Sequence, residues 1–524
     1  MSERIAFVGG LVADGNGGEP KLLDVVVEGK KIVQLLEYGK VDANRIIDCS
    51  GLLIAPGFID IHSHSDLSRI AYPDAPTRSL QGITTEVIGN CGISPAPLGG
   101  NFEEFRTLLG PIDVVPTLAI DWKSMSEYLN CLDATPGSTN LAPLLGHGNL
   151  RYSVMGLSGG AATVEQRAQM VSQLDQALKL GYWGLSLGFM YAPGELSERQ
   201  ELDSLTAVLH KHGALLTSHM RGYDKTGLVA AVIEALDIAQ SGRVALEISH
   251  LRSINDDGSA LERAIEIIRA SNVDVEADAY PYLAGHTTLL QLLSPEIRGR
   301  GVTEILRLIR SVPSQIAADF RSASSFDPAL ISIAKAGESV APEVGSTLAE
   351  LVGENESKVK GIDWASVAVN LLDRYDGNVD VIVVGTRQVD ANRVLQLDFV
   401  SVASDGLALE LNHFYNLPHP RSIGTFPRAF RELSLAGIST GEIIRKMTSK
   451  PARRIGIRDR GVIAENLIAD ICVLNAAKLR DNATYRTPLV PPSGIVHVMV
   501  AGQFIVSDCT PTGARPGTLL RRTS

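Results

Sequence analysis

The sequence predicts an α/β protein: a TIM-like (β/α)8 barrel joined to a small β-sandwich domain built from both chain termini. Two observations lead to this prediction. Between about residues 56 and 455, short apolar strands alternate with helical segments. The first 55 residues and about the last 70 are rich in strands instead. Hydrophobic residues make up 45% of the 524 residues and charged residues 20%, which is typical of a globular protein with a large core.

Both ends of the chain alternate apolar and polar residues between turns. Residues 22–37 and 45–57 do so near the start and residues 494–508 near the end, with Gly and Asp at the breaks. A period of two, bounded by turn residues, is the pattern of short antiparallel strands. Because the two ends are alike and flank a long middle, we predict that residues 1–55 and 456–524 form one β-sandwich domain.

The middle of the chain, residues 56–455, contains eight candidate strands separated by helical segments. Residues 163–181 and 227–242, for example, have apolar side chains at helical spacing. Regular strand–helix alternation indicates a parallel sheet, and about eight such units indicate a closed barrel. The candidate strands are residues 57–64, 84–91, 139–148, 183–189, 214–220, 244–250, 274–280 and 397–405.

One connection in this pattern is much longer than the others. About 115 residues, from about 283 to 397, separate the seventh and eighth candidate strands. Connections in compact domains have a median length of about 4–6 residues. Residues 300–312, within this stretch, have helical periodicity. We therefore predict an insertion at about 283–397 that covers the active site.

Charge and cysteine content restrict the class of protein. The net charge of −11 and the pI of about 5.6 argue against a nucleic-acid partner, but not against a small anion bound by a buried arginine. The N-terminus has no basic segment before a long apolar run, and no stretch approaches the roughly 18 apolar residues of a membrane span. The five cysteines are scattered, as reduced thiols are. We expect a cytoplasmic protein without a membrane partner, and its oligomeric state stays open.

Potential metal ligands stand at the ends of the candidate strands. The carboxyl ends of barrel strands meet on one face, where the active sites of such barrels are built. His62 and His64 lie on the same side of their strand, because side chains alternate with period two. Imidazoles combined with a thiolate or a carboxylate suit zinc, which lowers the pKa of a bound water to about 7. The potential ligands are His62, His64, Cys91, His219, His250 and Asp405.

Each of these residues has an ordinary explanation when it is taken alone. A single histidine at a strand end is more often a structural, hydrogen-bonded residue. Cys91 could be a small buried apolar group, and Asp405 could cap the helix that follows it. Their shared placement at strand ends favours a metal centre over these separate explanations.

Longer motifs surround these residues throughout the barrel segment. They are PGFIDIHSH (56–64), NCGISPAPL (90–98), GLSLGFMYAPG (184–194), SHMRG (218–222), EISHLRS (247–253), DAYPYLAG (278–285), SDG (404–406) and HPRSIGTFP (419–427). Together these motifs resemble the D-aminoacylase family, the N-acyl-D-amino-acid deacylases of the amidohydrolase superfamily. The match runs in order along nearly the whole chain, and it implies a metal-bearing barrel with a small β-sandwich.

The resemblance implies how the ligands divide between metal positions. The tight Zn²⁺ site would consist of Cys91, His219 and His250, and the second, weaker and often empty site of His62, His64 and Asp405. Hydantoinase-like relatives instead bridge two zinc ions with a carbamylated lysine from the fourth strand. Residues 184–189 contain no lysine, and Cys91 supplies a ligand from the second strand, as in the D-aminoacylases.

The resemblance also implies roles in catalysis and substrate binding. Asp405 would be the general base that takes a proton from the attacking water and returns it to the leaving amine. Tyr191 would lie near the reacting carbonyl. Arg421 and Tyr282 would bind the substrate α-carboxylate, which the planar guanidinium fork matches.

Arg252, two residues past His250, bears on substrate choice. Relatives that prefer acidic D-amino acids carry a basic residue in this region, so Arg252 would favour an acidic or polar substrate side chain. An ion pair with a neighbour such as Asp256 or Asp257 is the open alternative.

We therefore expect a zinc-dependent enzyme that hydrolyses N-acyl-D-amino acids to a carboxylate and a free D-amino acid. Its partner would be a small-molecule N-acyl amino acid or a related amide. Two alternatives remain: hydrolysis of another amide, a cyclic imide or a carbamate at the same metal centre, and an inactive homologue that serves as a binding subunit. The complete ligand set argues against the second. The acyl group, the side chain and strict D-stereochemistry stay open, because motif spacing does not report pocket geometry.

Overall fold

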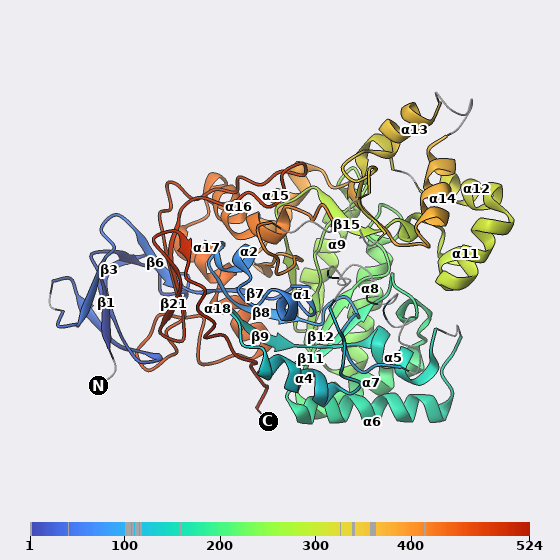
Figure 1. Ribbon diagram of the computed structural model, residues 1–524. Coiled ribbons are helices and arrows are strands. Elements are labelled where there is room, and N and C mark those ends of the chain that lie inside the picture. Colours follow the sequence, from blue (N-terminus) through green and yellow to red (C-terminus); the bar gives the residue numbers. More distant parts are fainter. Residues whose placement is uncertain are drawn as a thin grey trace.

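A computed structural model describes residues 3–39, 41–99, 106, 109, 115, 118–157, 160–324, 326–337, 341–356, 363–412 and 416–523. A barrel of parallel strands lies at its centre, and the eight candidate strands are confirmed (Figure 1). The strands are β7 (Phe58–Asp60), β8 (Ile83–Ile88), β9 (Asn140–Pro143), β10 (Leu145–Gly146), β11 (Gly184–Gly188), β12 (Leu215–His219), β13 (Leu246–Ile248), β14 (Val275–Ala279) and β18 (Val400–Val402). They pair in parallel in the orders β7-β8-β9 and β10-β11-β12-β13-β14-β18, and only Leu144 separates β9 from β10.

The barrel closes where β18 meets β7. Within the described chain these two strands share no regular ladder, and a single parallel bridge joins Ser63 to Gly406 just beyond them. The Asp405 N–H donates to the His62 carbonyl over 2.8 Å, and the His64 N–H donates to the Gly406 carbonyl over 2.8 Å. We call segments 62–64 and 404–406, which these bonds join, the closing seam.

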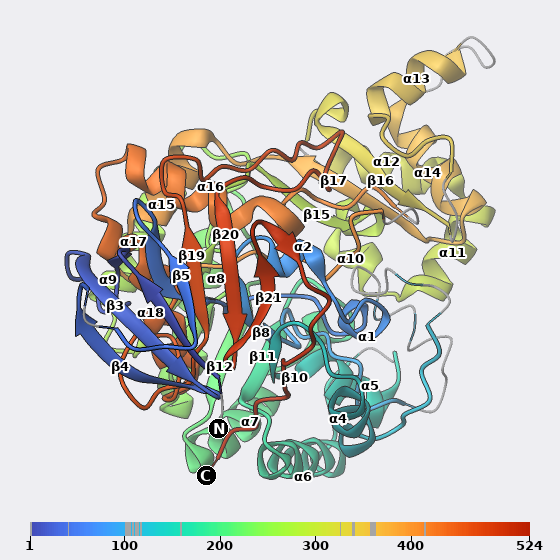
Figure 2. The ribbon, with the colours of Figure 1, turned by 60° about the vertical axis from the view of Figure 1, so that its left-hand side comes forward.

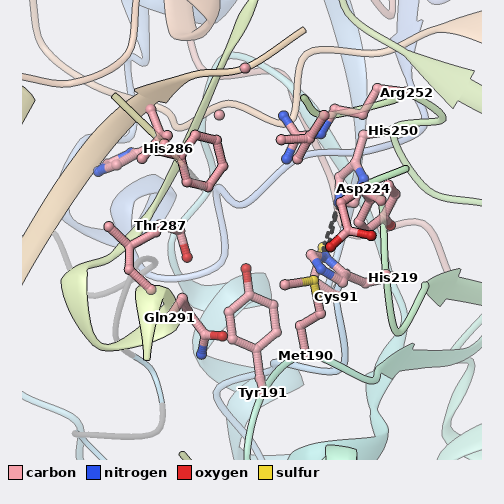
Figure 3. Close-up of a pocket in the computed structure, with 18 of the residues that line it drawn as sticks. Cys91, Met190, Tyr191, His219, Asp224, His250, Arg252, His286, Thr287 and Gln291 are labelled. Atoms are coloured by element: carbon pink, nitrogen blue, oxygen red, sulfur yellow. Dashed lines mark hydrogen bonds between the residues drawn. The ribbon is translucent and has the colours of Figure 1, made fainter. Parts of the chain in front are cut away.

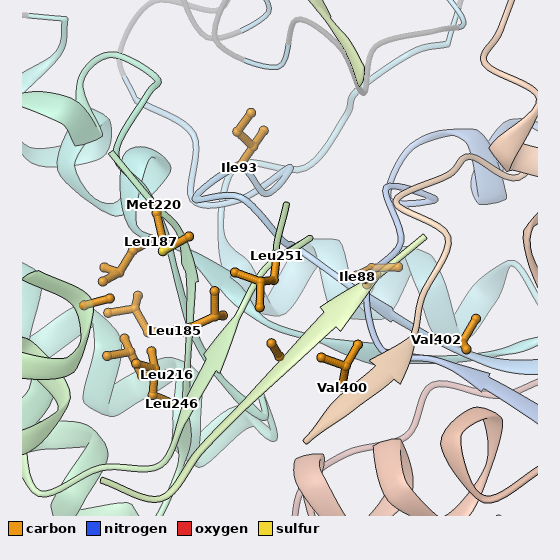
Figure 4. Close-up of a cluster of buried hydrophobic side chains, with 14 of the residues drawn as sticks. Ile88, Ile93, Leu185, Leu187, Leu216, Met220, Leu246, Leu251, Val400 and Val402 are labelled. Atoms are coloured by element: carbon orange, nitrogen blue, oxygen red, sulfur yellow. The ribbon is translucent and has the colours of Figure 1, made fainter. Parts of the chain in front are cut away.

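Helices cover the outside of the barrel and pack on the strands through apolar faces. They are α5 (His147–Met155), α6 (Val164–Leu180), α7 (Arg199–His212), α8 (Leu228–Gly242), α9 (Ser259–Ala270), α15 (Gln388–Gln396), α16 (Arg421–Leu435) and α17 (Thr440–Met447). A capping box of Thr163 and Gln166 starts α6, so the helix expected at 163–181 is confirmed, as is α8 at 227–242. Side chains such as Leu185 from β11 and Leu216 from β12 form the core beneath them (Figure 4).

Strands from both ends of the chain form one ten-stranded sheet. Its order is β22-β21-β20-β19-β6-β2-β3-β1-β5, with β4 beside β3, and the two ends of the chain meet where β6 pairs antiparallel with β19. Phe7 and Val25 share one apolar core with Ile471 and Met499, so both termini stabilise the same unit. The strands are β1 (Arg4–Val8), β2 (Leu11–Val12), β3 (Lys21–Glu28), β4 (Lys31–Glu37), β5 (Arg45–Asp48), β6 (Leu53–Pro56), β19 (Ile471–Leu474), β20 (Ile495–Val500), β21 (Gln503–Ser507) and β22 (Thr510–Pro511). The domain limits at 55 and 456 stay predictions.

A separate unit lies between β14 and β18. Its antiparallel sheet has the order β15-β17-β16, and side chains such as Phe320 and Leu372 form a core distinct from that of the barrel. Its elements are β15 (Ala284–Thr288), α10 (Pro295–Arg298), α11 (Val302–Ser311), α12 (Pro313–Ala323), β16 (Ile331–Ala336), α13 (Leu348–Glu356), α14 (Trp364–Arg374) and β17 (Val379–Val384). Helix α11 confirms the helix expected at 300–312, whereas α15, at the end of the expected insertion, packs on β18 and α16 of the barrel. The insertion and the terminal sheet lie on opposite sides of the barrel (Figures 1 and 2).

Shorter helices complete the described structure: α1 (Ser68–Ala71), α2 (Pro76–Ser79), α4 (Met125–Ala134) and α18 (Ser449–Ile455). Among the residues described, none of the helices has the length and apolar character needed to cross a membrane.

Candidate metal centre and active site

The structure brings all the potential ligands together at the carboxyl face of the barrel. They form two buried groups that share the Cys91 sulfur, and the ligand atoms in each group lie within 4.8 Å of one another. Figure 3 shows Cys91 with His219 and His250 at one side of the cavity. The first group is His62, His64, Cys91 and Asp405, and the second is Cys91, His219 and His250.

The Cys91 sulfur is the centre of this cluster. It lies 3.3 Å from His62 Nε2, 3.4 Å from His219 Nδ1 and 3.5 Å from His250 Nε2. The far nitrogen of His62, Nδ1, lies 3.1 Å from the Asp278 carboxylate, and a carboxylate behind a ligating imidazole is the usual arrangement in metal sites. A thiolate surrounded by imidazoles, with a carboxylate beside them, is a donor set that fits zinc.

Three of the ligands have an unusual backbone conformation. The φ angles of Cys91, His250 and Asp405 are 55°, 36° and 52°, in the left-handed region that side-chain-bearing residues seldom adopt. Such residues cost about 1–3 kcal/mol each, and they persist where surrounding structure holds them in place. Their occurrence at three ligands is consistent with a functional site held in a strained geometry.

The ligands differ in protonation when no metal is bound. Burial raises the pKa of the Cys91 thiol, but the imidazoles of His62 and His219 outweigh burial and hold that pKa well below its usual range. Burial lowers the pKa of His219 to about 4. Burial also lowers the pKa of His62, but the Asp278 carboxylate outweighs it and raises that pKa well above its usual value. At neutral pH the thiolate and His219 are therefore free to bind a metal, whereas His62 holds a proton.

We expect zinc uptake at the position of His62, His64 and Asp405 to strengthen as the pH rises. Burial lowers the pKa of His64, but the hydrogen bond with Asp405 outweighs it and raises the pKa to about 9. Below that pH a zinc ion must displace the proton, which weakens binding by about tenfold per pH unit for each proton displaced. Equilibrium dialysis of the metal-free protein from about pH 6 to about pH 9 measures the effect. Release of all zinc in a single step at one pH contradicts it.

A cavity of about 370 Å³ opens above the ligand cluster. Residues of the barrel line one side of it, among them His64, Cys91 and Asp405. Residues of the insertion line the other side, among them His286, Thr287 and Gln291, and these face the barrel residues in Figure 3. Residues of the insertion therefore form part of the cavity wall, and the expectation that the insertion covers the active site stays a prediction.

Two arginines on the cavity wall lie beside Tyr280. Arg421 donates to the Asp405 carboxylate over 2.6 Å, and its guanidinium lies 5.1 Å from the centre of the Tyr280 ring. Arg252 donates to the Tyr280 hydroxyl and lies 5.6 Å from the centre of the Tyr223 ring. Among the described residues, no carboxylate oxygen lies within 4.0 Å of the Arg252 guanidinium. Within the described part of the chain, this side chain is therefore a cation on the cavity wall that forms no close ion pair.

The acidic neighbours named for Arg252 are engaged elsewhere. Asp256 accepts from the Leu261 N–H over 3.3 Å, and Asp257 pairs with Lys225 at 2.7 Å. The ion-pair alternative for Arg252 is therefore wrong for these two carboxylates.

The two tyrosines named from the sequence have different surroundings. Tyr191 lines the cavity, and its ring centre lies 4.9 Å from that of His219. Tyr282 is not among the described residues that line this cavity, and its hydroxyl donates to Asp481 over 3.4 Å. The chain bends at Pro281, so Tyr280 and not Tyr282 comes to lie beside Arg421.

The chain is similar to known enzymes along its whole length. A model of the amidohydrolase family matches residues 45–188. An N-acyl-D-glutamate deacylase of Alcaligenes xylosoxydans xylosoxydans is 32% identical over 535 residues, which span 100% of this chain and 98% of that enzyme. A D-aminoacylase of the same organism is 30% identical, over 99% of this chain and 98% of its own length. The chain belongs to the D-aminoacylase family.

A solved structure of the D-aminoacylase family has the same fold. The N-acyl-D-glutamate deacylase from Bordetella bronchiseptica, complexed with zinc and a phosphonate that mimics the tetrahedral intermediate, superposes with a TM-score of 0.82. It is 29% identical, and the match covers 99% of this chain and 100% of that one. The resemblance and the fold class expected from the sequence are confirmed, and the protein is a metal-dependent amidohydrolase.

Two residues beside this site were not predicted from the sequence. Asp278, behind His62, stands in the DAYPY motif that was singled out, and a carboxylate at a strand end was a signal for it. Tyr280 stands in the same motif, two residues before Tyr282, and spacing alone could not separate the two.

Proposed function

We propose that this protein hydrolyses N-acyl-D-amino acids to a carboxylate and a free D-amino acid, with zinc as its metal. The observation that carries the proposal is the contact between Arg421 and Asp405. One carbon separates the carboxylate of such a substrate from the scissile nitrogen, so the carboxylate site and the general base must be neighbours. Relatives named as N-acyl-D-glutamate deacylase and D-aminoacylase support the stereochemistry.

Zinc would bind most tightly at Cys91, His219 and His250. This group offers a thiolate and, in His219, an imidazole that is neutral at pH 7, so no proton has to leave either. The position of His62 and His64 is the weaker one, because both imidazoles are protonated there. A zinc ion held by these residues would supply an acidified water and would polarise the amide carbonyl.

Asp405 would move the proton. Burial raises its pKa, but Arg421 outweighs burial and holds the pKa well below its usual range, so the carboxylate is ionised. It can accept the proton of the attacking water and return it to the leaving amine. Burial raises the pKa of Tyr191, so its hydroxyl stays neutral and can donate to the carbonyl oxygen as negative charge develops there.

The α-carboxylate would lie on Arg421. The guanidinium fork matches a carboxylate, and Tyr280 rather than Tyr282 would stand beside it. Arg252, on the other side of Tyr280, would meet an acidic side chain of the substrate. Its lack of a carboxylate partner among the described residues supports a preference for N-acyl-D-glutamate or N-acyl-D-aspartate.

Replacing Arg252 with leucine is expected to lower kcat/KM for N-acetyl-D-glutamate by about 10- to 100-fold, because a charged hydrogen bond contributes about 1.5–3 kcal/mol. Activity on N-acetyl-D-leucine should change little. Arg221→Leu is the matched control, since Arg221 also lines the cavity but is already paired with Glu234 at 3.0 Å. Equal losses on both substrates would remove Arg252 from side-chain recognition.

The proposed function is tested with paired N-acetyl-D- and N-acetyl-L-amino acids and zinc-loaded protein. Turnover confined to the D-substrates supports the proposal, and the preferred side chain then tests the assignment of Arg252. Absence of turnover with every pair, while zinc is bound, would favour a different amide, a cyclic imide or a carbamate.

A further inference from the structure

The closing seam contains three of the six potential metal ligands, but few backbone hydrogen bonds join its two segments in the described chain. His62, His64 and Asp405 all belong to it. Two backbone hydrogen bonds, at a single parallel bridge, hold its two segments together in the part of the chain that the structure describes. Since ligand positions must hold within about 0.5 Å for a site to work, something else has to fix this seam.

Arg78, in helix α2, lies directly behind the seam. The side chain is 0% exposed, and so are Asp60 and Glu86, the two carboxylates that it pairs with. Its guanidinium also donates to the Ser404 hydroxyl over 2.9 Å and to the Ser422 carbonyl over 3.3 Å. One buried guanidinium therefore contacts β7, β8, the segment after β18 and the start of α16.

These contacts continue to the ligand-bearing backbone. The Asp60 carboxylate accepts from the N–H of Ser404, over 2.9 Å, and from the N–H of His62, over 3.3 Å. Glu86 accepts from the hydroxyls of Ser63, over 2.8 Å, and Ser65, over 2.5 Å. Both neighbours of His64, the residue before Asp405 and the N–H of His62 itself are thus tied to a carboxylate that Arg78 holds.

The glycine of the SDG motif packs against the same side chain. A Cβ on Gly406 would lie 3.0 Å from Arg78 Nη1, from the Ser404 hydroxyl and from the backbone Cα of Ser422. A larger residue at 406 would push against the guanidinium, so the motif and Arg78 fit each other. Burying a guanidinium costs less when acceptors and opposite charges surround it: Arg78 Nη1 and Nη2 donate hydrogen bonds, and Nε lies 3.0 Å from the Glu86 carboxylate as an ion pair.

We propose that Arg78 is a positioning residue: by bonding Asp60, Glu86 and Ser404, it fixes the seam ligands relative to the Cys91, His219 and His250 group. The inference rests on the proposed function only for its kinetic readout. Arg78 would not contact the substrate or the metal ligands themselves. It would act on them through the backbone of segments 62–64 and 404–406.

Arg78→Lys keeps the charge and removes the fork that bonds two strands at once. We expect the affinity for the second equivalent of zinc, at the seam, to fall by about 10- to 100-fold, as loss of an outer partner of a metal ligand usually causes. Binding of the first equivalent should be unchanged. We expect kcat to fall by a similar factor while KM stays the same, because the cavity wall is untouched. Zinc titration followed by metal analysis measures the first effect and needs no substrate.

The matched control is Arg151→Lys. Arg151 is also fully buried and paired with a glutamate, Glu201. This pair links α5 to α7, away from the seam. If Arg78→Lys fails to fold, Ser404→Ala removes one contact from the same network and decides the matter. Equal weakening of both zinc equivalents, or an effect no larger than that of Arg151→Lys, overturns the inference. If the wild type hydrolyses no N-acyl-D-amino acid, the zinc titration still tests Arg78 while the proposed function fails.

Discussion

Replacing Asp405 with asparagine is expected to lower kcat by about 10²- to 10⁴-fold, the usual contribution of a positioned general acid–base group. Asparagine preserves the shape of the side chain but cannot accept a proton. The KM should change little, because Arg421 and the cavity wall remain in place. Steady-state kinetics with the preferred N-acetyl-D-amino acid, at matched zinc content, measures the effect.

The chain offers a control at the other end of β18. Asp398 precedes β18, is exposed and pairs with Arg269, whereas Asp405 follows β18 and lies beside the cavity. Asp398→Asn makes the same chemical change at the opposite end of β18 and should leave kcat unchanged. A kcat near wild type for Asp405→Asn would assign the proton transfer to another group.

Replacing Cys91 with serine is expected to remove zinc from both positions. The Cys91 sulfur belongs to both ligand groups, and a serine hydroxyl stays protonated at neutral pH and is a poor zinc ligand. The affinity for zinc should fall by more than the roughly 10- to 100-fold that follows loss of a group hydrogen-bonded to a metal ligand. Activity should be lost together with the zinc. Metal analysis after dialysis and a kinetic assay on the same sample measure both.

Cys509→Ser is the control for this substitution. Cys509 is an exposed free cysteine far along the chain, so its removal tests for unspecific effects of losing a thiol. Retention of one full zinc equivalent by Cys91→Ser would contradict the shared role of the sulfur, and would leave the histidines and Asp405 as the sole ligands.

The sequence by itself determined the barrel strands and pointed to the candidate ligands that the fold brings together. Strands are local features, with apolar runs bounded by turn residues, and in a parallel barrel their carboxyl ends meet at one face. His62, Cys91 and Asp405 could therefore be placed together although they are far apart in the chain. The terminal strands followed from the same local alternation, which both ends of the chain share.

Only the tertiary structure decided which polar groups face one another. Tyr280 and Tyr282 stand in one motif, and the bend at Pro281 sends one towards Arg421 and the other towards Asp481. Whether Arg252 is paired depended on where Asp256 and Asp257 point, which spacing does not encode.

The Arg78 network was likewise invisible in the sequence, because its partners come from four separate segments of the barrel and meet only when the seam closes. Strand patterns depend on neighbouring residues, whereas side-chain pairing across a cavity depends on contacts that form only once distant elements have packed.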